Sequence, residues 1–232
     1  MSTCIITGAS RGIGRQIAVK LSESKNIDNF VIISRGKKAL EETYEMMNKE
    51  KKIKIYAVDL ENLDVAKELI EEVAKEYGTI DYLVNCAGYA DPQPLLETSV
   101  ENWNKTFAVN VTSMFFIIRE VVKVMKKTGG KILNIASTAG SSARPGWLAY
   151  AASKAAVISI SKTLSAELQE YGIKVYCISP GRCATELRKI LAPDEDPTTI
   201  MQPEDVAVVV RNLLSDMGDC LDGQDITIRQ QV

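Results

Sequence analysis

Short apolar runs of strand length recur along this chain, and stretches with helical periodicity separate them. Most of the runs are continuously apolar rather than alternating, which is typical of parallel strands buried on both faces of a sheet. Right-handed crossovers between such strands predict a doubly wound α/β fold with one seven-stranded parallel sheet, helices on both faces, and a site at the carboxyl ends of the strands. The predicted strands are Thr3–Ile6, Phe30–Ile33, Ile53–Val58, Tyr82–Asn85, Lys131–Ile135, Lys174–Ile178 and Ile226–Ile228. The predicted helices are Gly12–Ser24, Lys38–Lys49, Leu63–Tyr77, Val100–Lys126, Ala149–Tyr171 and Pro203–Ser215.

No linker interrupts this alternation, so we expect the 232 residues to form a single domain, residues 1–232. The net charge of −2 provides no basic field for nucleic acid or an acidic membrane. No apolar run approaches the roughly 20 residues of a membrane span, and the first residues lead directly into a strand, so no signal peptide is expected. Five scattered cysteines without CxxC spacing favour a reducing cytoplasm.

The absence of histidine narrows the possible chemistry. It excludes a Ser-His-Asp triad, a histidine metal site and a histidine general base. Any general acid or base must therefore come from Tyr, Lys, Asp, Glu or Cys, and the sequence implies no metal.

Tyr150 and Lys154 have the spacing of a proton-transfer pair. On a helix, residues four apart lie on the same face. A phenol with a pKa of roughly 10 is a poor acid or base near neutrality, but a fixed ammonium beside it favours the phenolate and lowers that pKa. Ser137 lies thirteen residues before Tyr150 and follows the predicted strand Lys131–Ile135. YxxxK alone occurs by chance, so the order and spacing of the whole set carry the argument.

Gly8, Gly12 and Gly14 follow the first predicted strand and open the first predicted helix. The amino end of a helix carries free N–H groups and a partial positive charge, and glycines let a pyrophosphate approach the backbone. The spacing is GxxxGxG rather than GxGxxG. The alternative interpretation is an ordinary glycine-rich turn.

Ser34 and Arg35 end the second predicted strand, where NAD-binding proteins usually carry an acidic residue for the ribose 2′-OH. Arg11 lies inside the glycine turn. Two guanidiniums without a competing carboxylate suit a 2′-phosphate, so NADP(H) is favoured over NAD(H), and reduction over oxidation. Each arginine alone could instead be a solvated surface charge.

In this order and spacing, the motifs resemble those of the short-chain dehydrogenase/reductase family in its single-domain form, over Thr3 to Ile228. The resemblance implies a Rossmann-like fold, an NAD(P) cofactor, and reduction of carbonyls or oxidation of alcohols. The matching motifs are Thr7–Gly14, Asp59-Leu60, Asn85-Cys-Ala-Gly88, Asn110, Ser137, Tyr150 with Lys154, Pro180-Gly181 and Thr185.

The resemblance also implies roles. Tyr150 would donate a proton to the developing alkoxide, and Ser137 would hydrogen-bond the carbonyl oxygen. Lys154 would stabilise the tyrosinate and bind ribose hydroxyls, and Asn110 would hold a water that links Lys154 to solvent. Asp59 would bind the adenine amino group, and Thr185 the nicotinamide carboxamide. Asn85 could instead serve only the sheet. The implied cofactor-binding residues are Gly8, Ser10, Arg11, Gly12, Ile13, Gly14, Ser34, Arg35, Asp59, Leu60, Asn85, Ala87, Gly88, Tyr150, Lys154, Pro180, Gly181 and Thr185.

The substrate is less constrained. Arg144 precedes Tyr150, and Arg182, Arg188 and Lys189 follow Pro180-Gly181. These cations suit an anionic carbonyl compound, such as a sugar phosphate or an acyl chain on phosphopantetheine, but could equally be solvated. The general plan is similar to 3-oxoacyl-carrier-protein reductases and to pentose-phosphate reductases that act beside cytidylyltransferases. The alternatives are an NAD-preferring alcohol dehydrogenase and a non-catalytic NADP(H) sensor.

The two longest predicted helices suggest self-association. Val100–Lys126 carries aromatic residues and Ala149–Tyr171 carries small ones, and one face of each must cover the sheet. Apolar residues on the opposite faces predict an interface. The family resemblance points to pairing of these helices about a two-fold axis, in a homodimer or homotetramer. The alternative is that all these side chains are internal.

Overall fold

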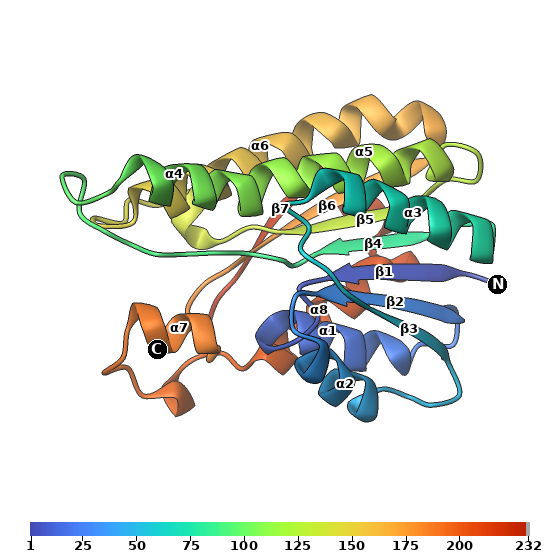
Figure 1. The fold of residues 1–232 in the computed structure, drawn as a ribbon, viewed down its shortest axis with the longest axis horizontal. Helices are drawn as coiled ribbons and strands as arrows, with labels where there is room; N and C mark the ends of the chain where they lie inside the picture. The colour runs from blue at the N-terminus through green and yellow to red at the C-terminus, as the bar shows by residue number, and fades with distance from the viewer. Residues whose placement is uncertain (231–232) are drawn as a thin grey trace.

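The computed structural model describes residues 1–230, which are arranged around one seven-stranded sheet (Figure 1). All neighbouring strands are parallel and follow the order β3-β2-β1-β4-β5-β6-β7. The predicted doubly wound parallel sheet is therefore confirmed. The strands are β1 Thr3–Thr7, β2 Asn29–Ser34, β3 Lys52–Ala57, β4 Tyr82–Asn85, β5 Gly130–Ile135, β6 Ile173–Pro180 and β7 Asp225–Ile228.

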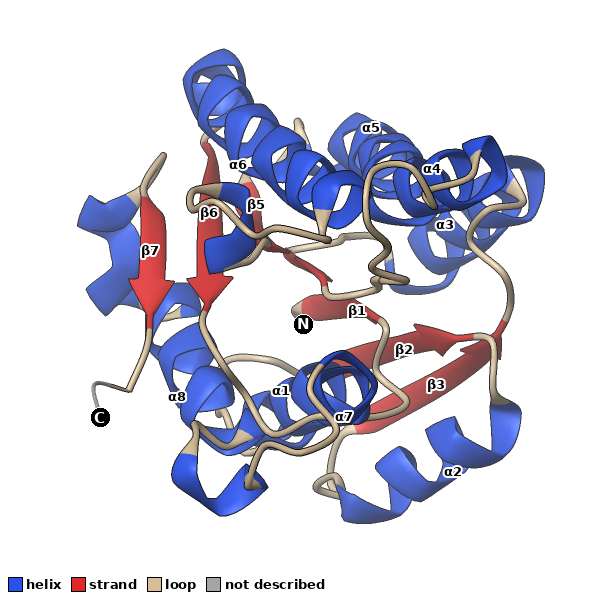
Figure 2. Ribbon diagram, turned by 90° about the vertical axis from the view of Figure 1, so that its left-hand side faces the viewer, coloured by secondary structure: helices blue, strands red, loops and turns tan. Residues whose placement is uncertain are grey.

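Helices cover both faces of the sheet, as Figures 1 and 2 show. Buried apolar side chains of α1, α2 and α8 form one core with the sheet, and those of α3, α5 and α6 form the other. Two burying faces explain why the strands are continuously apolar. The helices are α1 Gly12–Ser22, α2 Lys37–Met46, α3 Leu63–Tyr77, α4 Val100–Phe107, α5 Ser113–Met125, α6 Leu148–Leu168, α7 Glu186–Leu191 and α8 Pro203–Leu214.

Two predicted helices need correction, and one helix was not predicted. The predicted helix Val100–Lys126 is interrupted by a π-helical turn at Ala108–Thr112, which separates α4 from α5. The predicted helix Ala149–Tyr171 ends in a 3-10 turn at Gln169–Tyr171, before Gly172 with φ 66°. Helix α7 was not predicted, because its six residues are too few to show helical periodicity.

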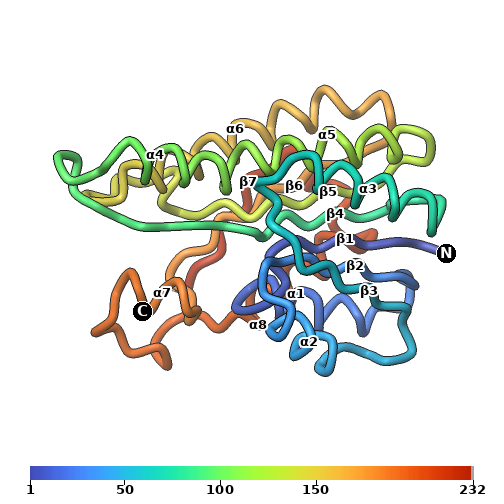
Figure 3. The backbone as a smooth tube through the Cα atoms, in the orientation of Figure 1, coloured from blue at the N-terminus to red at the C-terminus, as the bar shows by residue number. Residues whose placement is uncertain are grey.

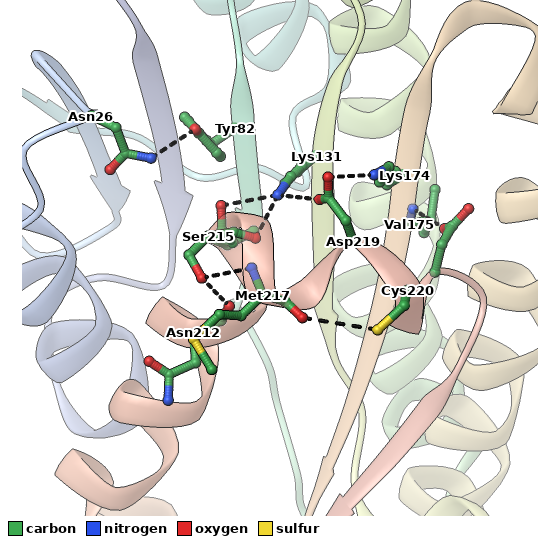
Figure 4. A network of polar contacts seen from close by, with 12 residues as sticks. Asn26, Tyr82, Lys131, Lys174, Val175, Asn212, Ser215, Met217, Asp219 and Cys220 are labelled. Atoms are coloured by element: carbon green, nitrogen blue, oxygen red, sulfur yellow. Dashed lines mark hydrogen bonds and ion pairs between the residues drawn. The ribbon is translucent and has the colours of Figure 1, made fainter.

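Two lysines, Lys131 and Lys174, connect the end of the sheet where the strands begin to the end of α8 and the segment after it; we call this set of contacts the lysine clamp. Lys131, at the start of β5, donates from Nζ to the carbonyl oxygens of Leu214 (3.3 Å), the last residue of α8, and of Ser215 (2.7 Å), the residue after it. Its ammonium also lies 2.7 Å from Asp219, which Lys174 of β6 reaches at 2.8 Å (Figure 4). The clamp secures α8 and the segment after it to the sheet.

The strand order reverses direction between β1 and β4, and the loops that leave the carboxyl ends of the strands gather there. Figure 3 traces one of them, residues 86–99, from β4 to the start of α4. None of the helices within residues 1–230 is both long and apolar enough to cross a bilayer.

Candidate active site

A cavity of about 1150 Å³ opens at the carboxyl ends of the strands. It brings together the glycine turn after β1, the end of β2, the loop after β3, and the segments that carry Ser137 and Tyr150. Most residues singled out in the sequence line its wall, but Asn85 and Asn110 are buried behind it. The lining residues from the sequence motifs are Gly8, Ser10, Arg11, Gly12, Ile13, Gly14, Ser34, Arg35, Asp59, Leu60, Ala87, Gly88, Ser137, Tyr150, Lys154, Pro180, Gly181 and Thr185.

The glycine turn is packed too closely for larger residues. Gly8 has φ 68°, and a Cβ there would lie 2.6 Å from the Ala87 nitrogen. A Cβ on Gly14 would lie 2.2 Å from the carbonyl oxygen of Gly8. Gly12, with φ 55°, faces the Thr185 side chain, 3.3 Å from the position of its missing Cβ. These contacts leave an open backbone cradle at the amino end of α1, which fits a pyrophosphate.

Two residues that the sequence analysis missed brace this turn. Arg15 donates from Nε to the Ser10 carbonyl oxygen at 3.0 Å, and the Thr43 hydroxyl of α2 donates to the Ala9 carbonyl oxygen at 2.9 Å. Arg15 also reaches Glu42, 3.0 Å away. A cation in the first turn of a helix opposes the helix dipole, so the position of Arg15 was itself a signal of a specific partner.

The end of β2 carries no carboxylate on the cavity wall. Ser34 Oγ accepts a weak hydrogen bond from Gly36 N–H, 3.4 Å, and Arg35 is exposed. Arg11, the residue before α1, is also exposed to the cavity. The acids nearby are Asp59, which accepts from Glu61 N–H at 3.1 Å, Glu61, which pairs with Lys105, and Glu186, whose pKa is lowered mainly by Lys189 and to a smaller extent by the charge of Arg11. This end of the cavity therefore offers two guanidiniums without an ion-pair partner among residues 1–230.

Tyr150 and Lys154 occupy the first turns of α6, whose start at Leu148 places both side chains inward. Lys154 is buried and donates from Nζ to the Ile135 carbonyl oxygen at 2.8 Å. Its nitrogen lies 5.8 Å from the centre of the Tyr150 ring. Ser137 follows β5 and accepts from Ala139 N–H at 3.2 Å, which fixes the turn. Tyrosine, lysine and serine thus meet on one side of the cavity.

Burial controls the protonation of this pair. It raises the pKa of Tyr150 to about 12, while hydrogen bonding by Ser137 acts in the opposite direction. Burial also lowers the pKa of Lys154 to about 8. The predicted lowering of the Tyr150 pKa is not found, because burial is the largest influence on this phenol and raises its pKa, and the hydrogen bond with Ser137 offsets only part of that rise.

Asn110 lies in the π-helical turn between α4 and α5 and connects it to the loop after β4 and to α6. Its Nδ2 donates to the Tyr89 carbonyl oxygen and to Ser153 Oγ, both at 2.9 Å, and its Oδ1 accepts from Tyr89 N–H at 2.8 Å. Ser153 in turn donates to the Tyr150 carbonyl oxygen at 2.7 Å. Both N–H groups of Asn110 are therefore used, so a water would have to bind its oxygen.

Asn85 bonds within the sheet layer. Its Nδ2 donates to Asn134 Oδ1 at 2.9 Å, and Asn134 donates to Ser161 Oγ of α6 at 2.9 Å. This places Asn85 in a buried chain of polar side chains rather than on the cavity wall.

The four cations considered for the substrate separate into three groups. Lys189 is not among the residues that line the cavity, and it pairs with Glu186 at 2.8 Å. Arg182 and Arg188 line the cavity and share the carboxylate of Glu195. Arg144 lines it without an ion-pair partner within residues 1–230. No group of His, Cys, Asp and Glu in the described part of the chain could hold a metal ion.

The protein-family model for short chain dehydrogenases matches residues 2–196 of the chain. A 3-oxoacyl-(acyl-carrier-protein) reductase FabG of Staphylococcus epidermidis is 31% identical over 237 residues, covering 97% of this chain and 96% of the relative. The 3-oxoacyl-(acyl-carrier-protein) reductase of Synechocystis sp. is 34% identical over 220 residues, covering 91% of this chain and 88% of the relative.

Solved structures agree with the fold. The structure of ElxO with NADP bound superposes with a TM-score of 0.88 at 27% identity, covering 98% of this chain and 96% of that one. A variant of an actinorhodin polyketide ketoreductase with NADPH gives a TM-score of 0.89 at 25% identity, covering 98% of this chain and 95% of that one.

Proposed function

The chain belongs to the short-chain dehydrogenase family, and from that premise we propose that it is an NADPH-dependent reductase that converts a ketone to a secondary alcohol. One observation carries the proposal: Ser137, Tyr150 and Lys154 line the same cavity as the glycine turn. A nicotinamide cofactor lying along that turn would share one enclosed space with a carbonyl compound beside Tyr150.

The chain's own residues supply the polar part of the reaction. When bound, a nicotinamide would supply the hydride for the carbonyl carbon, and negative charge would then develop on the carbonyl oxygen. Tyr150 donates its hydroxyl proton to that oxygen, and Ser137 stabilises the oxygen by hydrogen bonding. A pKa of about 12 keeps Tyr150 protonated at neutral pH, as an acid must be before it reacts. Lys154, the nearest ammonium, stabilises the tyrosinate that remains.

Arg11 and Arg35 support the preference for NADPH, because both lie exposed at the end of the cavity where β2 ends in Ser34. Ser34→Asp with Arg35→Ala should shift the preference toward NADH by about tenfold or more, since a charge-assisted hydrogen bond contributes about 1.5–3 kcal/mol. Lys38→Ala, an exposed change on α2, is the control. Equal affinity of the unchanged protein for NADH and NADPH would refute the assignment.

The direct test is NADPH oxidation with a panel of ketones. The panel should contain 3-oxoacyl thioesters, because the curated relatives are named for that chemistry, and phosphorylated ketoses, because Arg144 lines the cavity and has no ion-pair partner within residues 1–230. Turnover of a member identifies a reductase. NADPH binding without turnover across the panel would favour the non-catalytic sensor.

The remaining expectations form part of the same proposal. Residues 1–232 would act as one domain, in which residues 231–232 lie outside the described part. The five cysteines are free thiols, which suits a cytoplasmic protein. The protein would be a homodimer or homotetramer.

A further inference from the structure

Helix α7 forms part of the cavity wall with little support from the rest of the fold. Within residues 1–230, no other helix or strand packs extensively against it. It lies on an excursion of the chain between β6 and α8, whose base is closed where Ala184 N–H donates to the Met201 carbonyl oxygen at 2.8 Å. A helix of six residues is not stable alone. Contacts beyond the base must therefore hold it.

The apolar side of α7 covers the surroundings of Tyr150. Leu187 and Leu191 pack against a small cluster that contains Tyr150. Trp147 packs against the same cluster, and its ring meets that of Tyr150 edge-on at 5.8 Å. Because Leu187 and Leu191 also line the cavity, the position of α7 determines how the space beside the tyrosine is enclosed.

A single carboxylate ties α7 to the chain on both sides of it. Glu195, after α7, accepts from Arg188 Nε at 2.5 Å and from Arg188 Nη2 at 2.9 Å. It also accepts from Arg182 Nη1, after β6, at 3.1 Å. The Glu195 side chain is only 15% exposed and that of Arg188 22%. Hydrogen bonds from Arg188 hold the pKa of Glu195 below its usual value, so the carboxylate is charged at neutral pH.

From these contacts we infer that Glu195 is a positioning residue that holds α7 over Tyr150 and thereby sets the affinity for the carbonyl substrate. The inference rests on the proposed function, since it gives Glu195 a part in that reaction. It also explains why Arg182 and Arg188 are arranged around one acid: a bidentate guanidinium fixes both distance and orientation. Glu195 acts through α7 and does not itself reach the reacting atoms.

Trp147 provides a readout that needs no substrate. The chain contains two tryptophans, so in a Trp103→Phe background the emission comes from Trp147. Glu195→Gln keeps the shape of the side chain but removes its charge. It should increase acrylamide quenching of Trp147. With NADPH saturating, it should raise KM for the carbonyl substrate by about three- to tenfold and leave kcat within about twofold.

Asp194→Asn is the matched control. Asp194 is the neighbouring acid, is exposed, and makes no ion pair in the described part of the chain. It should change neither quenching nor KM. Arg182→Gln removes one of the three hydrogen bonds to Glu195 and should give a smaller change in the same direction.

Two results would overturn the inference: unchanged quenching in a folded Glu195→Gln protein, or increased quenching with the KM of the unchanged enzyme. If Glu195→Gln does not fold, the same two readouts on Arg182→Gln decide. If no carbonyl compound is reduced, the proposed function fails, and with it the claim about substrate affinity. The quenching measurement then still decides separately whether Glu195 holds α7.

Discussion

Tyr150 is a buried phenol that holds its proton more tightly than a free tyrosine. Burial favours the neutral form of both Tyr150 and its neighbour Lys154. A reacting group that develops negative charge beside them therefore shifts their protonation equilibria. That is the condition under which a phenol is useful as an acid: it stays protonated until the alkoxide forms, and the lysine charge stabilises what remains.

Removing the Tyr150 hydroxyl tests this role. Tyr150→Phe keeps the ring and its packing but removes the proton donor, so we expect turnover to fall by about two to four decades. NADPH binding, followed by fluorescence titration, should remain nearly unchanged. Tyr171→Phe, at an exposed tyrosine, is the control for the substitution. Turnover close to that of the unchanged enzyme in Tyr150→Phe would rule out Tyr150 as the acid.

Lys154 makes stability depend on pH. Its pKa is lowered from 10.5 to about 8 in the folded protein, so between these values the unfolded chain binds more protons than the folded one. Stability attributable to this group therefore rises with pH through that window. We expect the free energy of unfolding of Lys154→Met, relative to the unchanged protein, to change little below pH 8 and to decrease between about pH 8 and pH 10. Urea unfolding measures it, and a difference that is independent of pH would contradict the lowered pKa.

At the scale of elements, Lys131 connects a strand to the end of a helix. Its ammonium bonds the carbonyl oxygens of Leu214 and Ser215 and pairs with Asp219, and its side chain is 15% exposed. Lys131→Met should lower the free energy of unfolding by about 1–3 kcal/mol, because charged hydrogen bonds at a helix end are lost.

Lys174→Met is the comparison for this clamp. Lys174 pairs with the same Asp219 but is 34% exposed and bonds no carbonyl of α8. We expect it to lower the free energy of unfolding by about 1 kcal/mol or less. Equal effects of the two substitutions in urea unfolding would mean that the carbonyl contacts of Lys131 do not stabilise α8.

The elements also show how far the sequence could predict this molecule. Continuous apolar runs indicate parallel strands because burial on both faces leaves no other pattern, and all seven strands were found. The π-helical turn at Ala108–Thr112 was missed because a single such turn inside a long helix has no residue signature that marks it in the sequence. Helix α7 was missed because six residues are too few to show helical periodicity.

The site shows the same division. The motif residues could be named individually, because glycines in a turn and a Tyr-Lys pair on a helix have local signatures. The raised pKa of Tyr150 could not be predicted, since it depends on how completely the fold excludes water there. Nor could the pairing of Arg182 and Arg188 with Glu195, which joins residues from three segments.

At the scale of the whole molecule, the outer side of α4 and α5 remains partly apolar. Val100 is 69% exposed, Trp103 37% and Phe115 48%, and α6 exposes the small residues Ala155 and Ser159. Apolar side chains beside small ones suit close helix pairing across a two-fold axis. This arrangement supports the predicted homodimer or homotetramer.

Light scattering at micromolar concentration tests the interface. The unchanged protein should have at least twice the chain mass of 25.5 kDa, and Phe115→Glu should shift it toward the monomer, because a buried unpaired charge is unfavourable. Val208→Glu, on the exposed side of α8, should leave the mass unchanged. A monomeric unchanged protein would refute self-association.

The most direct test of the central claim follows the hydride itself. The protein is incubated with a reducible ketone and NADPH that carries deuterium at C4 of the nicotinamide, with each of the two C4 isomers in turn, and the alcohol is analysed by mass spectrometry. If this chain is an NADPH-dependent carbonyl reductase, one isomer will place a single deuterium on the carbinol carbon, in proportion to the NADPH consumed. NADPH that binds but is not consumed with any ketone, or an alcohol that carries no deuterium from either isomer, would contradict the account.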